Sequence, residues 1–357
     1  HGYFTLIGCY LLMMFYTTIS GWLILYFVKT LKGDFVGLDT QGVAEVFDSV
    51  TADPVIQTIF MGLVVVLGML VCSRGLKNGV EKVNKAMMLC LLALLVVLAV
   101  RALTLPGAME GVKFYLVPNF HNLMYDADGS FRLFRAIYDA MGQAFFSLSI
   151  NGAGMLIYGS YMKKSEDIVH HSVMTALLDT LAALLAGFAI LPAVFSFGIA
   201  PNSGPALMFI TLPRVFQQMP GGRVLAVLFF LSVLFAGITS LINMLEAVSD
   251  CLGQGLGLPR TLSTLLVGGV VFGVGLFLEA LPDMGAWMDL ITIYIAPFGA
   301  VLGAVFIYWV LGLGPLRQEL MLGRERPLWR GFGPLAHLYV VLTAAVWVLG
   351  IVYGGIG

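Results

Sequence analysis

A patch of small and hydroxyl-bearing residues lies in the middle of an apolar segment. Residues 145–154 read FFSLSINGAG, with Ser147, Ser149 and Asn151 beside two glycines, and the flanking residues are apolar and helical in character. Unpaired backbone groups in hydrocarbon are costly, so a break in a membrane helix is tolerated only where it faces protein or a wet cavity. Carbonyls freed by such a break can bind a cation, and the N-terminus of a half-helix can hold a carboxylate. The patch therefore predicts a binding site at mid-membrane depth.

A second apolar segment, LFAGITSLINMLE (234–246), also carries polar groups at mid-depth, and we expect an interrupted helix there too. Its small and polar members are Gly237, Thr239, Ser240, Asn243 and Glu246. The alternative interpretation is that small residues merely let helices pack closely, and it applies best to Gly237 and Gly154 taken alone.

Two single residues also lie deep in predicted spans. Asp179, in TALLDTLAALLAG, is a carboxylate whose burial in a bilayer costs ~2.5–3.5 kcal/mol or more, which favours an ion or proton site. An interior, hydrogen-bonded acid without a transport role is the alternative. Tyr16, in MMFYTTISGW, is either a packing residue or a ligand contact, because a buried phenol needs a partner.

The composition requires a membrane. Charged residues make up 11% of the 357 residues and hydrophobic residues 59%, whereas a soluble domain has ~25% charged residues. The mean hydropathy is +0.95. The net charge of −1 argues against a nucleic-acid partner. The sequence has no GxSxG, HExxH, CxxC or phosphate-loop motif, so an enzyme is not expected.

The hydropathy pattern predicts nine spans, because a span needs ~20 apolar residues. They cover residues 3–28, 55–73, 86–105, 136–161, 168–198, 223–251, 261–279, 285–311 and 335–353. The stretch 201–222 mixes proline and glycine with short apolar runs, which indicates a re-entrant or capping hairpin. Alternate loops hold eleven and eight basic residues, and the first set is placed in the cytoplasm. Because His1 is followed almost at once by a span, we expect the N-terminus to be a cut.

Four stretches of the chain together resemble the bacterial branch of the neurotransmitter:sodium symporter family. They are CYLLMMFYTTISGW (9–22), GQAFFSLSINGAGMLIYGSYMKKSEDI (142–168), FITLPRVFQQMPGG (209–222) and FAGITS (235–240), in the family's order and spacing. The resemblance implies an all-α integral membrane protein with the LeuT-type inverted-repeat fold, truncated to the family's helices 3–11, with a broken sixth helix. One transmembrane transporter domain (1–357) would hold the remainder of the first repeat (1–105), the second repeat (136–311) and an additional helix (335–353).

The resemblance also implies two sodium sites. The first would use Ser147 and Asp179, and a carboxylate at the latter position resembles the members that need no chloride. The second would use the carbonyl of Ala236 and the hydroxyls of Thr239 and Ser240. Oxygen donors of this kind suit a hard cation.

The substrate and the gates follow from the same resemblance. Substrate-binding positions would be Leu12, Tyr16, Phe146, Ser149, Gly152, Ser240 and Met244, with Tyr16 at the substrate carboxylate and Phe146 as a lid. Asp289 would belong to the extracellular gate and Tyr161 to the inner gate. Gly152 stands where the best-known bacterial members have a large residue, and Gln254 stands where an inner-gate acid is expected.

The function implied is sodium-coupled symport of a neutral amino acid by alternating access, in the inner (plasma) membrane of a bacterium, as a multi-pass protein. Sodium ions are the expected cofactor, with no chloride requirement, and the expected partners are the amino acid and the lipid bilayer. The family's first two helices complete the site, so this chain alone is expected not to transport. The alternatives are a non-transporting binding or scaffold subunit built on the remnant fold and, less favoured, a channel.

Overall fold

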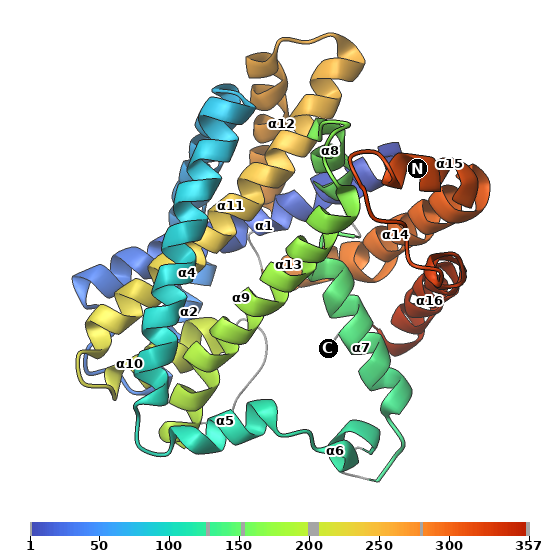
Figure 1. The fold of residues 1–357 in the computed structure, drawn as a ribbon. Helices are drawn as coiled ribbons and strands as arrows, with labels where there is room; N and C mark the ends of the chain where they lie inside the picture. Colours follow the sequence, from blue (N-terminus) through green and yellow to red (C-terminus); the bar gives the residue numbers. More distant parts are fainter. Residues whose placement is uncertain (1, 126–128, 151–153, 199–206, 279–280, 355–357) are drawn as a thin grey trace. The chain divides into compact units, whose positions relative to one another are not determined.

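The secondary-structure elements of the described residues are helices (Figure 1). The computed structural model describes residues 2–125, 129–150, 154–198, 207–278 and 281–354. The α-helices are α1 Gly2–Lys32, α2 Thr40–Ala52, α3 Pro54–Ser73, α4 Lys82–Leu103, α5 Ala108–Leu116, α6 Phe120–Met124, α7 Leu133–Ser147, α8 Gly154–Tyr161, α9 Ile168–Ser196, α10 Leu212–Gln217, α11 Gly222–Leu256, α12 Arg260–Gly275, α13 Leu281–Asp289, α14 Ala296–Val305, α15 Leu313–Leu320 and α16 Phe332–Tyr353. Short π-helical or 3₁₀ segments adjoin them: η1 Leu76–Glu81, η2 Leu207–Thr211, η3 Leu276–Leu278, η4 Leu290–Ile295 and η5 Phe306–Leu311.

Within the described residues, eight helical stretches are long and apolar enough to cross a membrane. They are Gly2–Lys32, Pro54–Ser73, Leu76–Leu103, Ile168–Ser196, Gly222–Leu256, Arg260–Leu278, Met284–Leu311 and Phe332–Tyr353, and each overlaps one of the nine predicted spans. The described part of the remaining predicted span, 136–161, contains α7 and α8, each too short to cross alone. The chain is a multi-pass membrane protein.

The expectation of a second interrupted helix, at 234–246, is wrong. Helix α11 runs unbroken over 35 residues, through Gly237 and the polar residues that follow it. The Thr239 hydroxyl bonds back to its own helix, to the carbonyls of Phe235 (2.9 Å) and Ala236 (3.0 Å). Such bonds satisfy a hydroxyl inside the helix, so polar residues at this spacing do not force a break.

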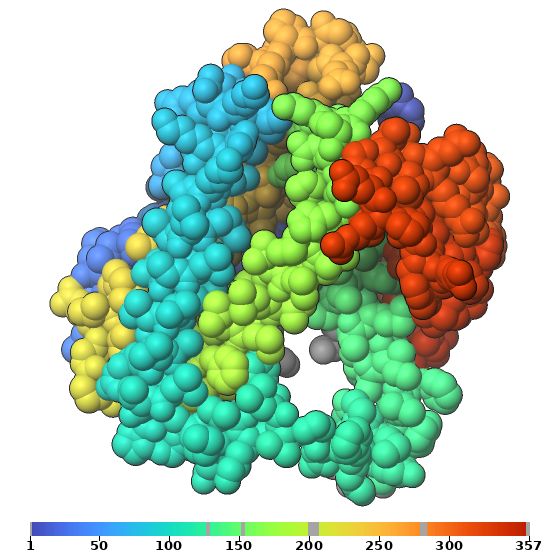
Figure 2. Space-filling model, in the orientation of Figure 1, coloured from blue at the N-terminus to red at the C-terminus, as the bar shows by residue number. Residues whose placement is uncertain are grey.

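The outward faces of the spans are apolar. On α4 the side chains of Leu89, Val97 and Val100 are 71%, 50% and 57% exposed. Figure 2 shows this helix, in cyan, at the face of the molecule turned toward the reader. A soluble protein rarely exposes so large an apolar surface, whereas helices surrounded by lipid must do so.

The chain divides into two compact units, each with its own contacts. Unit 1 contains residues 1–12, 119–180 and 285–357, and unit 2 contains residues 13–118 and 181–284. The division falls within α1, α9 and α13, so these helices contribute to both units. The division of the chain into the remainder of a first inverted repeat (1–105) and a second one (136–311) stays a prediction.

In unit 2, α11 packs along α4 and α12 (Figure 1), and it also packs against α3. Beside them, Trp22, Tyr26, Phe47 and Phe209 form a cluster of aromatic rings whose centroids lie 4.8–5.9 Å apart. The indole of Trp22 donates to Gln57 Oε1 (2.9 Å), which satisfies both buried polar groups. This cluster fixes α1 against the helices outside the spans, because Phe47 lies on α2 and Phe209 on η2.

In unit 1, α16 packs against α14 and α7. Tyr138 and Phe145 of α7 and Val346 of α16 form its buried core. Gly350 of α16 permits the close approach, since a Cβ there would come within 3.1 Å of the Tyr138 hydroxyl. The last turn of α7, which carries candidate site residues, is thereby held against α16.

Candidate functional site

Helix α7 ends at Ser147 in a defined motif. The amide of Ile150 donates to the carbonyl of Phe145 (2.9 Å), and the amide of Ser149 donates to the carbonyl of Phe146 (3.1 Å). These two bonds form a Schellman C-cap, whose residue after the cap takes the left-handed conformation. Ser149 occupies that position with φ 54°, where glycine is the usual residue. The helix therefore stops at a predicted break, and the next helix, α8, starts at Gly154.

The first candidate cation site brings Ser147 and Asp179 together in unit 1. Ser147 Oγ donates a hydrogen bond to Asp179 Oδ2 across 2.5 Å. The two residues are 32 positions apart, and Asp179 lies near the middle of α9. A hydroxyl and a carboxylate this close can donate oxygens to one hard cation. Their role as ligands stays a prediction.

The second candidate cation site lies in unit 2, on α11. The Thr239 hydroxyl is 3.0 Å from the Ala236 carbonyl oxygen, and Thr239 is buried. The side chain of the next residue, Ser240, lies close to that of Tyr16 on α1. Unit 2 therefore gathers a carbonyl, two hydroxyls and a phenol at neighbouring positions of α11 and α1. Met244 lies one turn further along α11.

The other predicted site residues lie in unit 1 or outside the described residues. Leu12 lies in the part of α1 that belongs to unit 1, and Phe146 lies in the last turn of α7 with 46% of its surface exposed. Gly152 falls outside the described residues. The gate residues also belong to unit 1: Asp289 ends α13 and is exposed, and Tyr161 ends α8.

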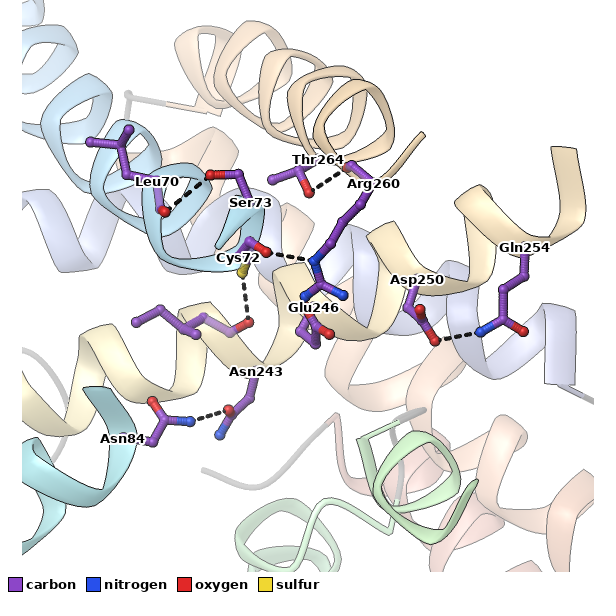
Figure 3. Close-up of polar contacts among 11 residues, drawn as sticks. Leu70, Cys72, Ser73, Asn84, Asn243, Glu246, Asp250, Gln254, Arg260 and Thr264 are labelled. Atoms are coloured by element: carbon purple, nitrogen blue, oxygen red, sulfur yellow. Dashed lines mark hydrogen bonds and ion pairs between the residues drawn. The ribbon is translucent and has the colours of Figure 1, made fainter. Parts of the chain in front are cut away.

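One polar cluster was missed by the sequence analysis (Figure 3). Glu246 of α11 is 2% exposed and accepts a hydrogen bond from Nη2 of Arg260, the first residue of α12. Arg260 Nε also donates to the carbonyl of Cys72 near the end of α3 (2.7 Å), so its guanidinium links three helices. The signal in the sequence was an acid inside an apolar span, which requires a partner.

The same face of α11 carries further polar contacts. Asn84 Nδ2 of α4 donates to Asn243 Oδ1 (2.6 Å), and Gln254 Nε2 donates to Asp250 Oδ2 (2.8 Å) (Figure 3). Among the described residues no group of three or more histidine, cysteine, aspartate or glutamate side chains could hold a metal ion together.

A membrane protein with a broken helix and oxygen-rich positions beside it has the architecture of an ion-coupled transporter. The comparisons with known proteins define the family. Residues 40–352 match the model of the sodium:neurotransmitter symporter family. The chain belongs to this family, which consists of transporters and not of enzymes.

Individual relatives support this family assignment. An uncharacterised sodium-dependent transporter of Bacillus subtilis is 37% identical over 340 residues, which cover 90% of this chain and 72% of that protein. One from Haemophilus influenzae is 34% identical over 278 residues, covering 77% of this chain and 59% of that protein. The crystal structure of MhsT in complex with L-phenylalanine matches 99% of this chain and 80% of its own, with 24% identity and a TM-score of 0.83. This last likeness shows the shared fold.

Proposed function

We propose that this protein takes part in sodium-coupled symport of a neutral amino acid across a membrane by alternating access. The observation that carries the proposal is the hydrogen bond between Ser147 and Asp179 (2.5 Å), next to the end of a broken helix. The names of the relatives, which are sodium-dependent transporters, support the choice of cation. A bacterial inner membrane is the proposed location, because two of these relatives are bacterial.

The two proposed cation sites differ in the charge of their oxygen ligands: the first includes a carboxylate, and the second has neutral oxygens alone. At the first, Asp179 supplies a negative charge that is part of the protein, and Ser147 supplies a hydroxyl. A fixed carboxylate would balance the cation charge, so no chloride is required. At the second, the Ala236 carbonyl with the Thr239 and Ser240 hydroxyls would contribute oxygen ligands to a cation without adding charge.

The substrate is proposed to be a neutral amino acid with a bulky side chain. The positions assigned to its side-chain pocket are Leu12, Phe146, Gly152 and Met244, and none is charged. A charged substrate side chain would lie there unpaired, at a cost of several kcal/mol. Tyr16, whose side chain lies close to that of Ser240, would hold the substrate carboxylate with its hydroxyl. MhsT, which has the same fold, was crystallised in complex with L-phenylalanine, a neutral amino acid with a bulky side chain.

The residues then act in sequence. Tyr16 would bind the substrate carboxylate, and Phe146 would act as the lid. Asp289 and Tyr161 contribute to the outer and inner gates, whose alternate opening exposes the site to one side at a time. Coupling requires the cation sites to be filled before the lid closes.

The test is a binding screen on the purified full-length gene product with a panel of amino acids, with and without sodium. We expect sodium-dependent binding of bulky neutral amino acids, and Ser147→Ala is expected to weaken it by about tenfold, since a hydrogen bond to a charged group is lost. Gly152→Phe is expected to weaken tryptophan or tyrosine binding far more than alanine binding. Binding that ignores sodium, or a preference for lysine, arginine, aspartate or glutamate, would overturn the proposal.

A further inference from the structure

Unit 2 contains a cavity that the proposed transport cycle does not use. Its volume is about 390 Å³, within the ~300–1,000 Å³ range of small-molecule sites. It lies where α1 ends and α11 begins, with α10 between them in the wall, at the end assigned to the non-cytoplasmic side by the basic-residue bias. All of its lining residues belong to unit 2.

The walls of the cavity are apolar and buried. Phe35, Phe216, Met219 and Phe230 are each at most 6% exposed, and Ala226 lies among them. Such walls receive an apolar body, because burial of its surface is favourable. An inorganic anion alone would leave this surface unused.

Two arginines line the same cavity. Arg214 Nη1 donates to the carbonyl of Leu38 (3.2 Å), and Arg223 Nη2 donates to the carbonyl of Leu31. These bonds anchor the guanidinium groups and leave each of them with further N–H donors, because a guanidinium has five. Within the described part of the chain, neither arginine forms an ion pair with a carboxylate.

The surrounding residues keep these charges available. Asp34, the acid of the turn that follows α1, pairs instead with Lys29 (3.7 Å). Gly33 in that turn has φ 89°, and a Cβ there would come within 3.3 Å of the guanidinium carbon of Arg223. A glycine at this position therefore allows the arginine to lie against the turn.

Gln217 also lines the cavity. The side-chain amide nitrogen of Gln217 is buried and donates to no acceptor among the described residues. The two guanidinium groups therefore supply the polar part of a site whose other walls are aromatic and aliphatic.

We propose that this cavity binds a small organic carboxylate with an apolar body, at a site separate from the transport site. The carboxylate would accept charge-assisted hydrogen bonds from Arg214 and Arg223, and the apolar body would lie against Phe216 and Phe230. Unlike the transported amino acid, such a ligand needs no ammonium group, since no carboxylate among the described residues lines the cavity.

The probe is 3-phenylpropionate, with the uncharged 3-phenylpropanamide as its comparison compound, and binding is measured by calorimetry on the purified full chain. We expect the acid to bind at least about tenfold more tightly than the amide. Arg214→Gln and Arg223→Gln should each weaken binding of the acid by about tenfold. Val36→Trp, at a rim residue that is 67% exposed, should block both compounds without disturbing the fold.

Two control variants distinguish binding in this cavity from a general effect of charge and from binding in the proposed transport site. Arg101→Gln removes a charge from the end of α4, outside the cavity, and should leave binding unchanged. Tyr16→Phe alters the proposed transport site and should also leave it unchanged. Absence of binding, equal affinity for acid and amide, or equal loss in Arg101→Gln would overturn the inference. Loss in Tyr16→Phe would place the probe in the transport site, which overturns this inference and leaves the proposed function standing.

Discussion

Ser147, the last residue of α7, donates its hydroxyl hydrogen to Oδ2 of Asp179 across 2.5 Å. The bond joins the end of one helix to the middle of another, and both residues belong to unit 1. A carboxylate in a membrane helix is costly unless it has a partner or a function. Here the partner is a neutral hydroxyl, so the negative charge itself remains available to a cation.

Asp179→Asn is expected to weaken sodium-dependent substrate binding or make it respond to chloride. The substitution keeps the shape of the side chain but removes the charge that would balance the cation. Binding is measured in sodium chloride and in sodium gluconate. Glu45→Gln, which removes an exposed carboxylate from α2, is the matched control and should behave as the parent protein. Normal binding of sodium and substrate by the Asp179→Asn variant in both salts would refute the role of Asp179.

Thr239→Val is expected to reduce sodium-dependent binding by about tenfold, because it replaces a hydroxyl near the Ala236 carbonyl with a methyl group of similar size. Thr343→Val is the control. Thr343 is also buried, and its hydroxyl donates to the carbonyl four residues earlier (2.7 Å), but it lies on α16. The two variants should lose similar stability in thermal unfolding, whereas only Thr239→Val should shift the sodium dependence. Equal shifts in both would argue for a general packing effect.

The Glu246–Arg260 pair predicts an asymmetry in stability (Figure 3). Arg260→Met should destabilise unit 2 by about 3–5 kcal/mol, because it leaves the charge of Glu246 buried without this cation. Glu246→Gln should cost less, since the Arg260 side chain is 35% exposed and keeps its bond to the Cys72 carbonyl. Unfolding of the purified protein by denaturant measures both. A larger loss for Glu246→Gln than for Arg260→Met would contradict this account.

The spans and the break at 145–154 could be predicted from the sequence because both depend on local composition. A run of ~20 apolar residues specifies a span wherever it occurs, and a cluster of serine, asparagine and glycine weakens a helix locally. The continuous α11 could not be predicted in this way. Serine and threonine in a membrane helix can bond to carbonyls of the preceding turn, and the sequence does not show whether they do.

The cluster around Arg260 depends on contacts between distant segments. Cys72, Glu246 and Arg260 lie on three helices, and the sequence shows only that an acid in an apolar span needs a partner. The pairing of Ser147 with Asp179 was predicted through the family resemblance, and the structure brings the two residues together. Sequence reasoning from the residues alone had left the partner of Asp179 open.

The stability of unit 1 should fall at acid pH through Asp167, which lies just before α9. The backbone N–H of His170 donates to Asp167 Oδ1 (3.0 Å), and Arg324 Nη1 contacts both carboxylate oxygens (3.1 and 2.8 Å). The His170 amide and, after it, the Arg324 charge hold the pKa of Asp167 below its usual value.

Because the pKa of Asp167 is lower in the folded state, its contribution to stability is present above the unfolded pKa of about 3.9. That contribution is lost as pH falls below this value through the folded pKa. Denaturant unfolding, followed from about pH 6 to about pH 3, should show a smaller acid-side loss in Asp167→Asn than in the parent protein. Glu45→Gln should keep the parent's profile, and an unchanged profile in Asp167→Asn would contradict the assignment.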